Sequence, residues 1–332
     1  MSKAMAPDPL MELCGASPVT CLYFQEEPFP CGALVLLSGH LNGKILSWDL
    51  KSQRVTASVK GHEESVLWMS MPKSDILISQ GREGYLKLWA AFPSGWDLLG
   101  QISTASHIFC NSSVLECEDK YLIFLPVEET GTVAGYQIPF DFKPCATQPA
   151  YHCAHQYRST PQKSYGMCMR ICAFRTNSWR TRLLVAYESG SLTLWDIQDS
   201  TPLSTVQAHS DTVMCLDICQ TKEPGVFKAM SGSVDTDLKS WLISGDILTQ
   251  EHEVSITNPG LGSLAARKDG RIFASGGWDG LCRIFTVAKL RPLAVLSNHK
   301  ESIQCVTFSA DNRIATGSKD GYITLWDVYA DK

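Results

Sequence analysis

Seven short segments of the chain share one pattern of polar and apolar positions. Each begins with a turn, continues as a strand in which apolar and polar residues alternate, and ends near an aromatic residue. The segments are residues 42–50, 83–91, 130–138, 189–197, 235–243, 279–287 and 320–328. Alternation with a period of two residues predicts β-strands that bury one face. The aromatic residues are Trp48, Trp89, Tyr136, Trp195, Trp241, Phe285 and Trp326.

The spacing of these aromatic residues indicates a repeated unit. Successive steps are 41, 47, 59, 46, 44 and 41 residues, close to the ~40–45 residues of a four-stranded propeller blade. The longest step contains a Cys-, His- and Pro-rich stretch, which we expect to form a long loop over residues 139–165. We therefore predict an all-β chain with one seven-bladed β-propeller over residues 9–332, preceded by a flexible segment, residues 1–8.

The last copy of the repeat stops one strand short of a complete blade. "PLMEL" (9–13) resembles "PLAVL" (292–296), and "VTCLYF" (19–24) resembles "IQCVTF" (303–308). We expect residues 9–13 to supply the missing outer strand of the seventh blade. Such pairing would close the ring and cover an exposed strand edge.

Composition narrows the class of protein further. The 332 residues carry a formal charge of −5, which argues against a nucleic-acid partner. The longest apolar runs are strand-length, so no membrane association is expected. The N-terminus lacks the apolar stretch of a secretory signal, and the cysteines are scattered in apolar runs. These features predict reduced cysteines and a cytoplasmic and nuclear location.

One cluster of Cys and His residues contains side chains of the types that bind metal ions. It comprises Cys145, His152, Cys153, His155, Cys168 and Cys172. Their spacings match no standard zinc module, so we expect no metal there. The sequence also lacks a Gly-rich phosphate loop and a nucleophile elbow. We therefore expect no cofactor and no catalytic residues.

The repeat, with its Trp-Asp pairs at 48–49, 195–196 and 326–327, resembles that of the WD-repeat β-propellers. In that family, a His, a Ser or Thr, the turn Asp and the strand-end Trp form a buried hydrogen-bonded network. The resemblance implies two full networks: His299, Thr316, Asp320 and Trp326; and His209, Ser231, Asp235 and Trp241. A third, His62, Ser79, Glu83 and Trp89, has Glu in place of the turn Asp. Repetition in several blades favours a structural role over a catalytic one.

The other blades depart from this network. The sixth has Ser275 and Asp279, but Phe285 in place of Trp, with His252 as the candidate imidazole. The first has Ser38 and Trp48, but Asn42 at the turn and no His in its network. The third and fourth copies lack the network.

The same resemblance implies a binding surface. In WD-repeat propellers, the residue before the turn Asp lies on the top face, near the central channel. By alignment these residues are Leu41, Arg82, Val234, Trp278 and Lys319, with Leu67, Met214 and Gln304 close by. Apolar and aromatic residues beside Arg and Lys have the composition of a protein-binding hot spot. The alternative is that Trp278 packs against a neighbouring blade, in space left by the missing indole at Phe285.

Residues 257–329 resemble most closely the guanine nucleotide-binding protein subunit beta-like propellers, a subfamily whose fungal members include the propeller subunit of the ASTRA assembly. This resemblance implies a non-catalytic adaptor that assists a cochaperone complex in the maturation and stability of phosphatidylinositol-3-kinase-related kinases. Two alternatives remain open.

One alternative is a substrate receptor of a cullin-type ubiquitin ligase. Such propellers often carry Trp-Asp-x-Arg, and the nearest match here is "WDLK" (48–51), with Lys51 in place of Arg. The other alternative is a G-protein β-like signalling subunit. True β subunits bind γ through a long N-terminal helix, and fewer than ten residues precede the expected closing strand, so we expect no γ partner.

Overall fold

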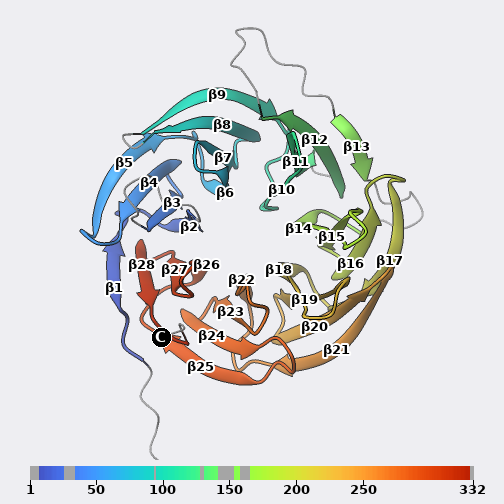
Figure 1. The fold of residues 1–332 in the computed structure, drawn as a ribbon. Helices are drawn as coiled ribbons and strands as arrows, with labels where there is room; N and C mark the ends of the chain where they lie inside the picture. Colours follow the sequence, from blue (N-terminus) through green and yellow to red (C-terminus); the bar gives the residue numbers. More distant parts are fainter. Residues whose placement is uncertain are drawn as a thin grey trace, which may run out of the picture.

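The chain folds into a ring of seven four-stranded antiparallel sheets around a central channel (Figure 1). The computed structural model describes residues 7–25, 34–92, 95–127, 131–140, 153–157 and 165–329. None of these segments forms an apolar helix of membrane-spanning length. The predicted flexible segment, residues 1–8, falls mostly outside the described residues.

Each blade is an up-and-down sheet whose successive strands lie progressively farther from the channel. Blade one consists of β2 (Val19–Phe24), β3 (Val35–His40), β4 (Lys44–Asp49) and β5 (Arg54–Lys60). Blade two consists of β6 (Val66–Lys73), β7 (Ile76–Gly81), β8 (Tyr85–Phe92) and β9 (Gly95–Ser103). Blade three consists of β10 (Ser113–Glu116), β11 (Lys120–Val127), β12 (Thr132–Pro139) and β13 (Cys153–Tyr157). Blade four consists of β14 (Cys168–Arg175), β15 (Thr181–Tyr187), β16 (Ser191–Asp196) and β17 (Thr201–Gln207).

The remaining three blades repeat this arrangement. Blade five consists of β18 (Val213–Gln220), β19 (Val226–Ser233), β20 (Asp237–Ser244) and β21 (Ile247–Ser255). Blade six consists of β22 (Leu261–Ala266), β23 (Ile272–Gly277), β24 (Leu281–Thr286) and β25 (Pro292–Ser297). Blade seven consists of β26 (Ile303–Phe308), β27 (Ile314–Ser318), β28 (Tyr322–Trp326) and β1 (Met11–Cys14).

The N-terminal strand closes the ring, as predicted. β1 pairs antiparallel with β28, and Met11 lies opposite Leu325 (Figure 1). Leu13 is buried in a hydrophobic cluster that joins blades seven and one, together with Val19, Ile323 and others. First and last blades are therefore held by backbone pairing and by a shared core.

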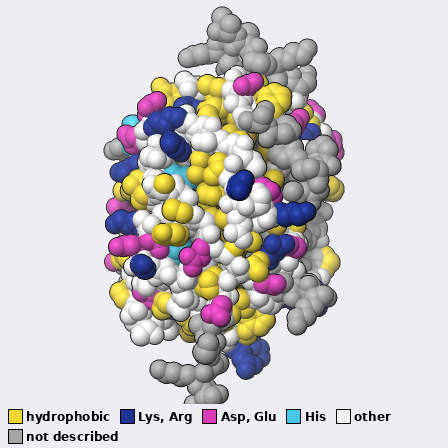
Figure 2. Space-filling model, turned by 90° about the vertical axis from the view of Figure 1, so that its left-hand side faces the viewer, with side chains coloured by type: hydrophobic (Ala, Val, Ile, Leu, Met, Phe, Trp, Pro, Cys, Tyr) yellow, Lys and Arg dark blue, Asp and Glu magenta, His cyan; other side chains and the backbone are white. Residues whose placement is uncertain are grey.

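The predicted long loop, residues 139–165, is interrupted by a strand. β13 (Cys153–Tyr157) pairs with β12 as the outer strand of blade three. Outer strands of a propeller have one free edge and mostly exposed side chains. Figure 2 views the rim near β1 and β5, where hydrophobic and charged side chains lie intermixed. Such a strand has no strong apolar alternation, which is why the sequence pattern did not reveal it.

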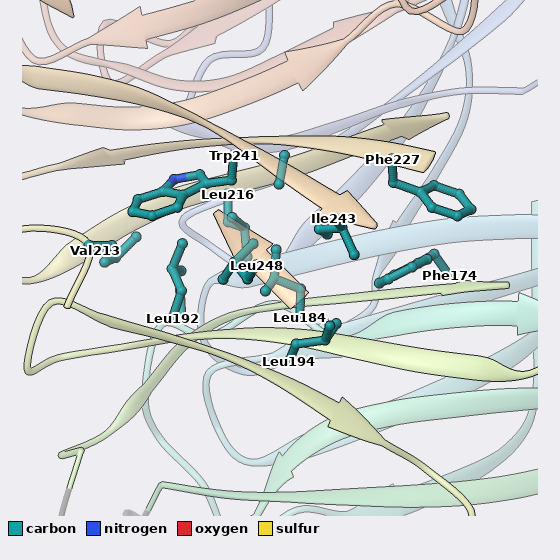
Figure 3. Packing of buried hydrophobic residues seen from close by; sticks show 13 residues of the cluster. Phe174, Leu184, Leu192, Leu194, Val213, Leu216, Phe227, Trp241, Ile243 and Leu248 are labelled. Atoms are coloured by element: carbon teal, nitrogen blue, oxygen red, sulfur yellow. The ribbon is translucent and has the colours of Figure 1, made fainter. Parts of the chain in front are cut away.

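The hydrophobic core lies between neighbouring blades rather than within a single layer. Seven clusters of buried hydrophobic side chains join the seven pairs of adjacent blades. Figure 3 shows the cluster between blades four and five, where Trp241 and Phe227 from blade five face Leu184, Leu192 and Phe174 from blade four. Each blade thus buries both faces against its two neighbours, so a missing blade or strand would expose apolar surface.

A bulge recurs at the start of the innermost strands. In six blades the register shifts between the first and third residue of that strand, for example between Val66 and Trp68. A bulge leaves one residue outside the regular pairing and turns its side chain. The second residue of the inner strand is therefore displaced at the mouth of the channel in these blades.

Candidate functional site

In blades two and seven, hydrogen bonds link all four side chains assigned to the network, and in blade five they link three of the four. In blade two, Trp89 Nε1 donates to Ser79 Oγ at 2.8 Å, and Ser79 Oγ lies 2.7 Å from His62 Nε2. His62 Nδ1 pairs with the carboxylate of Glu83. Since the carboxylate accepts from Nδ1–H, Nε2 accepts from the Ser79 hydroxyl, and each group has a partner.

The other two networks have the same order of contacts. In blade seven, Trp326 donates to Thr316 at 3.2 Å, Thr316 lies 2.9 Å from His299 Nε2, and Asp320 lies 3.1 Å from His299 Nδ1. In blade five, Ser231 Oγ lies 2.8 Å from both Trp241 Nε1 and His209 Nε2. The carboxylate of Asp235 is farther away, 3.4 Å from His209 Nδ1.

Blade one contains a network that the sequence pattern missed. Trp48 Nε1 donates to Ser38 Oγ at 2.8 Å, and Ser38 Oγ lies 2.9 Å from His40 Nε2. His40 Nδ1–H donates to the carbonyl of Ser17 at 3.1 Å. The interpretation that this blade has no histidine was wrong because the imidazole comes from the end of β3, not from the loop before β2.

Blade six replaces the network with an ion pair. The carboxylate of Asp279 accepts from Arg283 Nη1 at 3.1 Å and Nη2 at 2.6 Å, and from Asn258 Nδ2 at 2.9 Å. Assignment of His252 to this network was wrong, since His252 lies on β21 opposite Ser240, in blade five. The nearly buried Arg283 side chain pairs with the turn Asp as the imidazole does in other blades, while Ser275 Oγ donates to the backbone carbonyl of Arg283 at 3.4 Å.

These networks stabilise the blades and offer no open reaction site. The side chains of His62 and His209 have no exposed surface, and that of His299 is 1% exposed. Burial lowers the pKa of His62 and of His209, so both imidazoles are held neutral at pH 7. A neutral, buried imidazole bonded to a neighbouring hydroxyl cannot meet a substrate.

Five of the predicted top-face residues occupy equivalent positions. The backbone N–H of each donates to the carbonyl of the residue that precedes the inner strand of its own blade. The pairs are Leu41 to Pro18, Arg82 to Ser65, Val234 to Thr212, Trp278 to Gly260, and Lys319 to Ser302. Glu188 makes the same bond to Met167 in blade four, and the sequence pattern missed it. These turns lie on the same face as the loops between blades, because strands alternate in direction.

The predicted top-face residues differ in their accessibility. Leu41 is 51% and Trp278 is 43% exposed, and Lys319 and Gln304 are also exposed. Arg82, Met214 and Val234 are half-buried. Leu67, by contrast, is buried and lines the channel with Gln304, so it offers little surface to a partner.

Trp278 lies on the backbone of the loop that enters blade six. A Cβ added to Gly260 would stand 2.3 Å from Trp278 Cε3, and one added to Gly262 would stand 3.3 Å from Trp278 Nε1. Two glycines therefore make the seat for the indole. Trp278 thus lies against these glycines, whereas the alternative placed it in space left at Phe285. Phe285 is buried and stacks on Phe273 with ring centroids 5.4 Å apart.

A second exposed aromatic residue lies beside Arg82. Phe109, 52% exposed, stacks under the guanidinium of Arg82, with 4.3 Å from Arg82 Cζ to the ring centre. His107 Nδ1–H donates to the carbonyl of Arg82 at 3.0 Å and ties the same loop to blade two. The repeat pattern did not single out Phe109, which lies in the segment before the short inner strand β10.

The central channel opens between these residues. It has a volume of about 400 Å³ and is lined by the inner strands of all seven blades, including Asp217 and Arg170. Burial raises the pKa of Asp217 to about 6, even though its carboxylate accepts from the backbone N–H of Ala266 and Ile218. The top face therefore combines exposed aromatic residues, arginines and a polar channel.

The suspected metal cluster is only partly described. Cys145 and His152, and the side chains of Cys153 and His155, lie outside the described residues. Cys168 is buried and Cys172 half-buried in blade four, and burial raises the pKa of the Cys172 thiol well above its usual range. No group of three or more potential ligands occurs among the described residues.

Comparisons with known proteins place the chain among its relatives. The family described as "WD domain, G-beta repeat" matches residues 249–286 and 290–327. Guanine nucleotide-binding protein subunit beta-like protein 1 of Mus musculus is 32% identical, over 97% of each chain. ASTRA-associated protein 1 of Verticillium alfalfae is 24% identical over 89% of this chain and 87% of its own. The protein of the same name from Schizosaccharomyces pombe is 24% identical over 98% of this chain and all of its own.

The strongest of these matches runs nearly from end to end of both chains, and the structure shows the seven blades, the repeated turns and the buried networks that such repeats build. The chain therefore belongs to the WD-repeat β-propeller family, with guanine nucleotide-binding protein subunit beta-like protein 1 among its relatives.

Proposed function

We propose that this propeller is a non-catalytic adaptor in the cytoplasm and nucleus that assists a cochaperone complex in the maturation and stability of phosphatidylinositol-3-kinase-related kinases. The names of the fungal relatives support association with the ASTRA assembly. The structural observation that carries the adaptor function is the top face, where Trp278 and Phe109 are exposed beside Arg82. Exposed aromatic residues next to arginine are typical of protein-binding hot spots.

The test is capture of partners by tagged full-length protein from cells. Wild type is compared with Trp278→Ala and Arg82→Glu, and the steady-state levels of the kinases are measured in the same cells. Trp179→Ala is the matched control, because Trp179 is 77% exposed in the β14–β15 turn on the opposite face. We expect both top-face variants to melt like wild type, to lose cochaperone subunits and to lower kinase levels.

Other outcomes assign other functions. Capture of a cullin-linked ligase in place of cochaperone subunits would favour the substrate-receptor alternative and overturn the proposal. A G-protein γ subunit would favour the signalling alternative. Retention of cochaperone subunits by both top-face variants would move the binding surface away from this face.

A further inference from the structure

Arg170 spans the mouth of the channel. It lies at the bulge of β14, and its guanidinium donates to three backbone carbonyls: Met169 at 2.8 Å, Phe109 at 2.9 Å and Gly262 at 3.3 Å. Phe109 precedes blade three and Gly262 lies in blade six, so one side chain of blade four bridges parts of the ring that are not neighbours. The guanidinium is thus held between the two exposed aromatic residues, next to Phe109 and next to the glycine seat of Trp278.

Among the described residues, the positive charge at this mouth has no carboxylate partner. Within the described residues, neither Arg170 nor Arg82 lies within 4.0 Å of an acidic side chain, whereas Arg182, Arg267, Arg283 and Arg313 each pair with an Asp. Carbonyl groups satisfy hydrogen bonds but leave the charge uncompensated. Two of the five N–H groups of Arg170, on the adjacent nitrogens Nε and Nη2, have no acceptor among the described residues. Adjacent N–H groups are the pair that a carboxylate bridges.

The acidic residues nearest in sequence are already engaged. Glu83, beside Arg82, pairs with His62 and lies 3.8 Å from Lys87 Nζ. Glu188, on the same face in blade four, accepts from the backbone N–H of Met167 at 3.1 Å. Each of these carboxylates has a local partner, so the charges of Arg82 and Arg170 are available to a ligand.

Apolar surface flanks these charges on both sides. Phe109 and Trp278 keep about half of their side chains exposed, and Gly262 leaves room for the Trp278 indole. A Cβ at Gly262 would come 3.2 Å from the carbonyl of Ile303 and 3.3 Å from Trp278 Nε1. Across the mouth the order is therefore Arg82, Phe109, Arg170, Gly262 and Trp278.

On the basis of the adaptor function proposed above, we propose that this mouth binds an acidic segment of a partner protein. A carboxylate of the segment pairs with Arg170, a second lies near Arg82, and an apolar side chain between them packs on Phe109 and Trp278. Two arginines between aromatic rings suit a short peptide with alternating acidic and apolar residues. They are too few to track a phosphate backbone, whose binding needs many cations along one path.

The test uses purified full-length protein and fluorescently labelled peptides in which Glu alternates with Leu. Matched peptides carry Gln or Lys in place of Glu, and binding is read by fluorescence anisotropy. A carboxylate paired with arginine contributes about tenfold or more in affinity. We expect the Glu peptide to bind at least about tenfold more tightly than the Gln peptide, and added salt to weaken it.

Variants locate the contact. Arg82→Met, Arg170→Met and Phe109→Ala are each expected to weaken the Glu peptide by about tenfold. The control Arg291→Met, which changes an exposed arginine at the opposite end of blade six, leaves it unchanged. Because Arg170 also ties loops together, its variant is interpreted only alongside its melting temperature. Arg82→Met, which removes no side-chain hydrogen bond among the described residues, provides the independent measurement.

Three results would overturn the proposal: no binding of the Glu peptide to wild type, equal binding of the Gln peptide, or unchanged binding by folded Arg82→Met and Phe109→Ala. These outcomes are separate from those of the cellular capture experiment. If peptides bind as expected but cochaperone subunits are not captured, the acidic-segment site stands and the proposed function fails. If cochaperone subunits are captured but the peptides do not bind as expected, the adaptor function stands and its partner binds through other chemistry.

Discussion

Gly15 in blade one occupies the position of His62 in blade two, and His40 in blade one occupies the position of Gly81 in blade two. The glycine and the histidine are thus exchanged between the two blades. Gly15 lies four residues before Val19, as His62 lies four before Val66, and His40 pairs with Val19 as Gly81 pairs with Val66. A Cβ on Gly15 would stand 2.3 Å from His40 Cε1, and one on Gly81 would stand 2.2 Å from His62 Nδ1. The end of strand β3 in blade one and the loop before β6 in blade two thus deliver an imidazole to the same hydroxyl position.

This exchange predicts strong coupling between the two positions. Gly15→His alone should lower the free energy of unfolding by about 1–3 kcal/mol through overpacking. His40→Gly alone should leave the Ser38 hydroxyl without its histidine partner. The double variant moves the imidazole to the place it has in blade two, so it should be more stable than the sum of the two changes by about 1 kcal/mol or more. Urea denaturation measures all three variants. Additive effects would show that the two positions do not share one space.

The ring should depend on β1. Deletion of residues 1–15 exposes the edge of β28, so we expect aggregation or a large fall in melting temperature. Leu13→Ala, at a 2% exposed core position, should cost about 2–5 kcal/mol. The matched change Glu12→Ala, at an exposed position on the same strand, should cost about 0.5 kcal/mol or less. A deletion variant that melts like the full chain would contradict the observed closure.

Asp320→Ala should destabilise the protein without removing partner capture. The carboxylate accepts from His299 Nδ1, from the backbone N–H of Lys300 at 3.1 Å and from that of Tyr322 at 2.9 Å. Loss of these bonds should cost about 1–3 kcal/mol. Asp311→Ala, in a surface pair with Arg313, is the control and should cost about 1 kcal/mol or less. Lost capture in a fully folded Asp320→Ala variant would point to a functional role for this network.

Stability should fall as the pH is lowered below about 6.5, the ordinary pKa of histidine. Burial lowers the pKa of His40, His62 and His209. At these three histidines the folded protein therefore binds fewer protons than the unfolded chain, and acid favours unfolding. Asp217, whose pKa burial raises to about 6, acts in the opposite direction as the pH falls below that value, but one carboxyl group offsets only part of the effect of three histidines. Because the pKa values of Glu83 and Asp320 are lowered in the folded protein, the loss of stability continues as the pH falls below the ordinary pKa range of carboxyl groups. Melting temperature from about pH 7.5 to 5 measures the effect, and a flat profile would contradict it.

Gly260→Ala should disable the top face by moving Trp278. Gly260 has φ of +91°, and an added Cβ would collide with the indole. The expected result is loss of partner capture similar to that of Trp278→Ala. Gly225→Ala is the control, since Gly225 has φ of +79° and no atom within 4 Å of an added Cβ. Gly225→Ala should lose only the stability that backbone strain in its own turn costs. Full capture by Gly260→Ala would mean that the seated position of Trp278 is not required.

Much of the architecture follows from short stretches of sequence. Repeated alternation ending in residues such as Trp48, Trp89 and Trp326 was enough to predict seven blades, since each strand pairs with its immediate neighbour along the chain. Similarity between residues 9–13 and 292–296 was enough to predict ring closure. β13 escaped prediction because its sequence, Cys153–Tyr157, shows little alternation of apolar and polar residues.

The sequence by itself therefore determined the blades, their order, the closing strand and three of the buried networks, because these depend on contacts between segments that follow one another or repeat. Only the tertiary structure decided which side chains meet at the channel. Arg170 reaches Phe109 and Gly262 because ring closure brings blades three, four and six around one axis. No local pattern contains that arrangement, since it depends on the curvature of the whole ring and on the absence of side chains at Gly260 and Gly262.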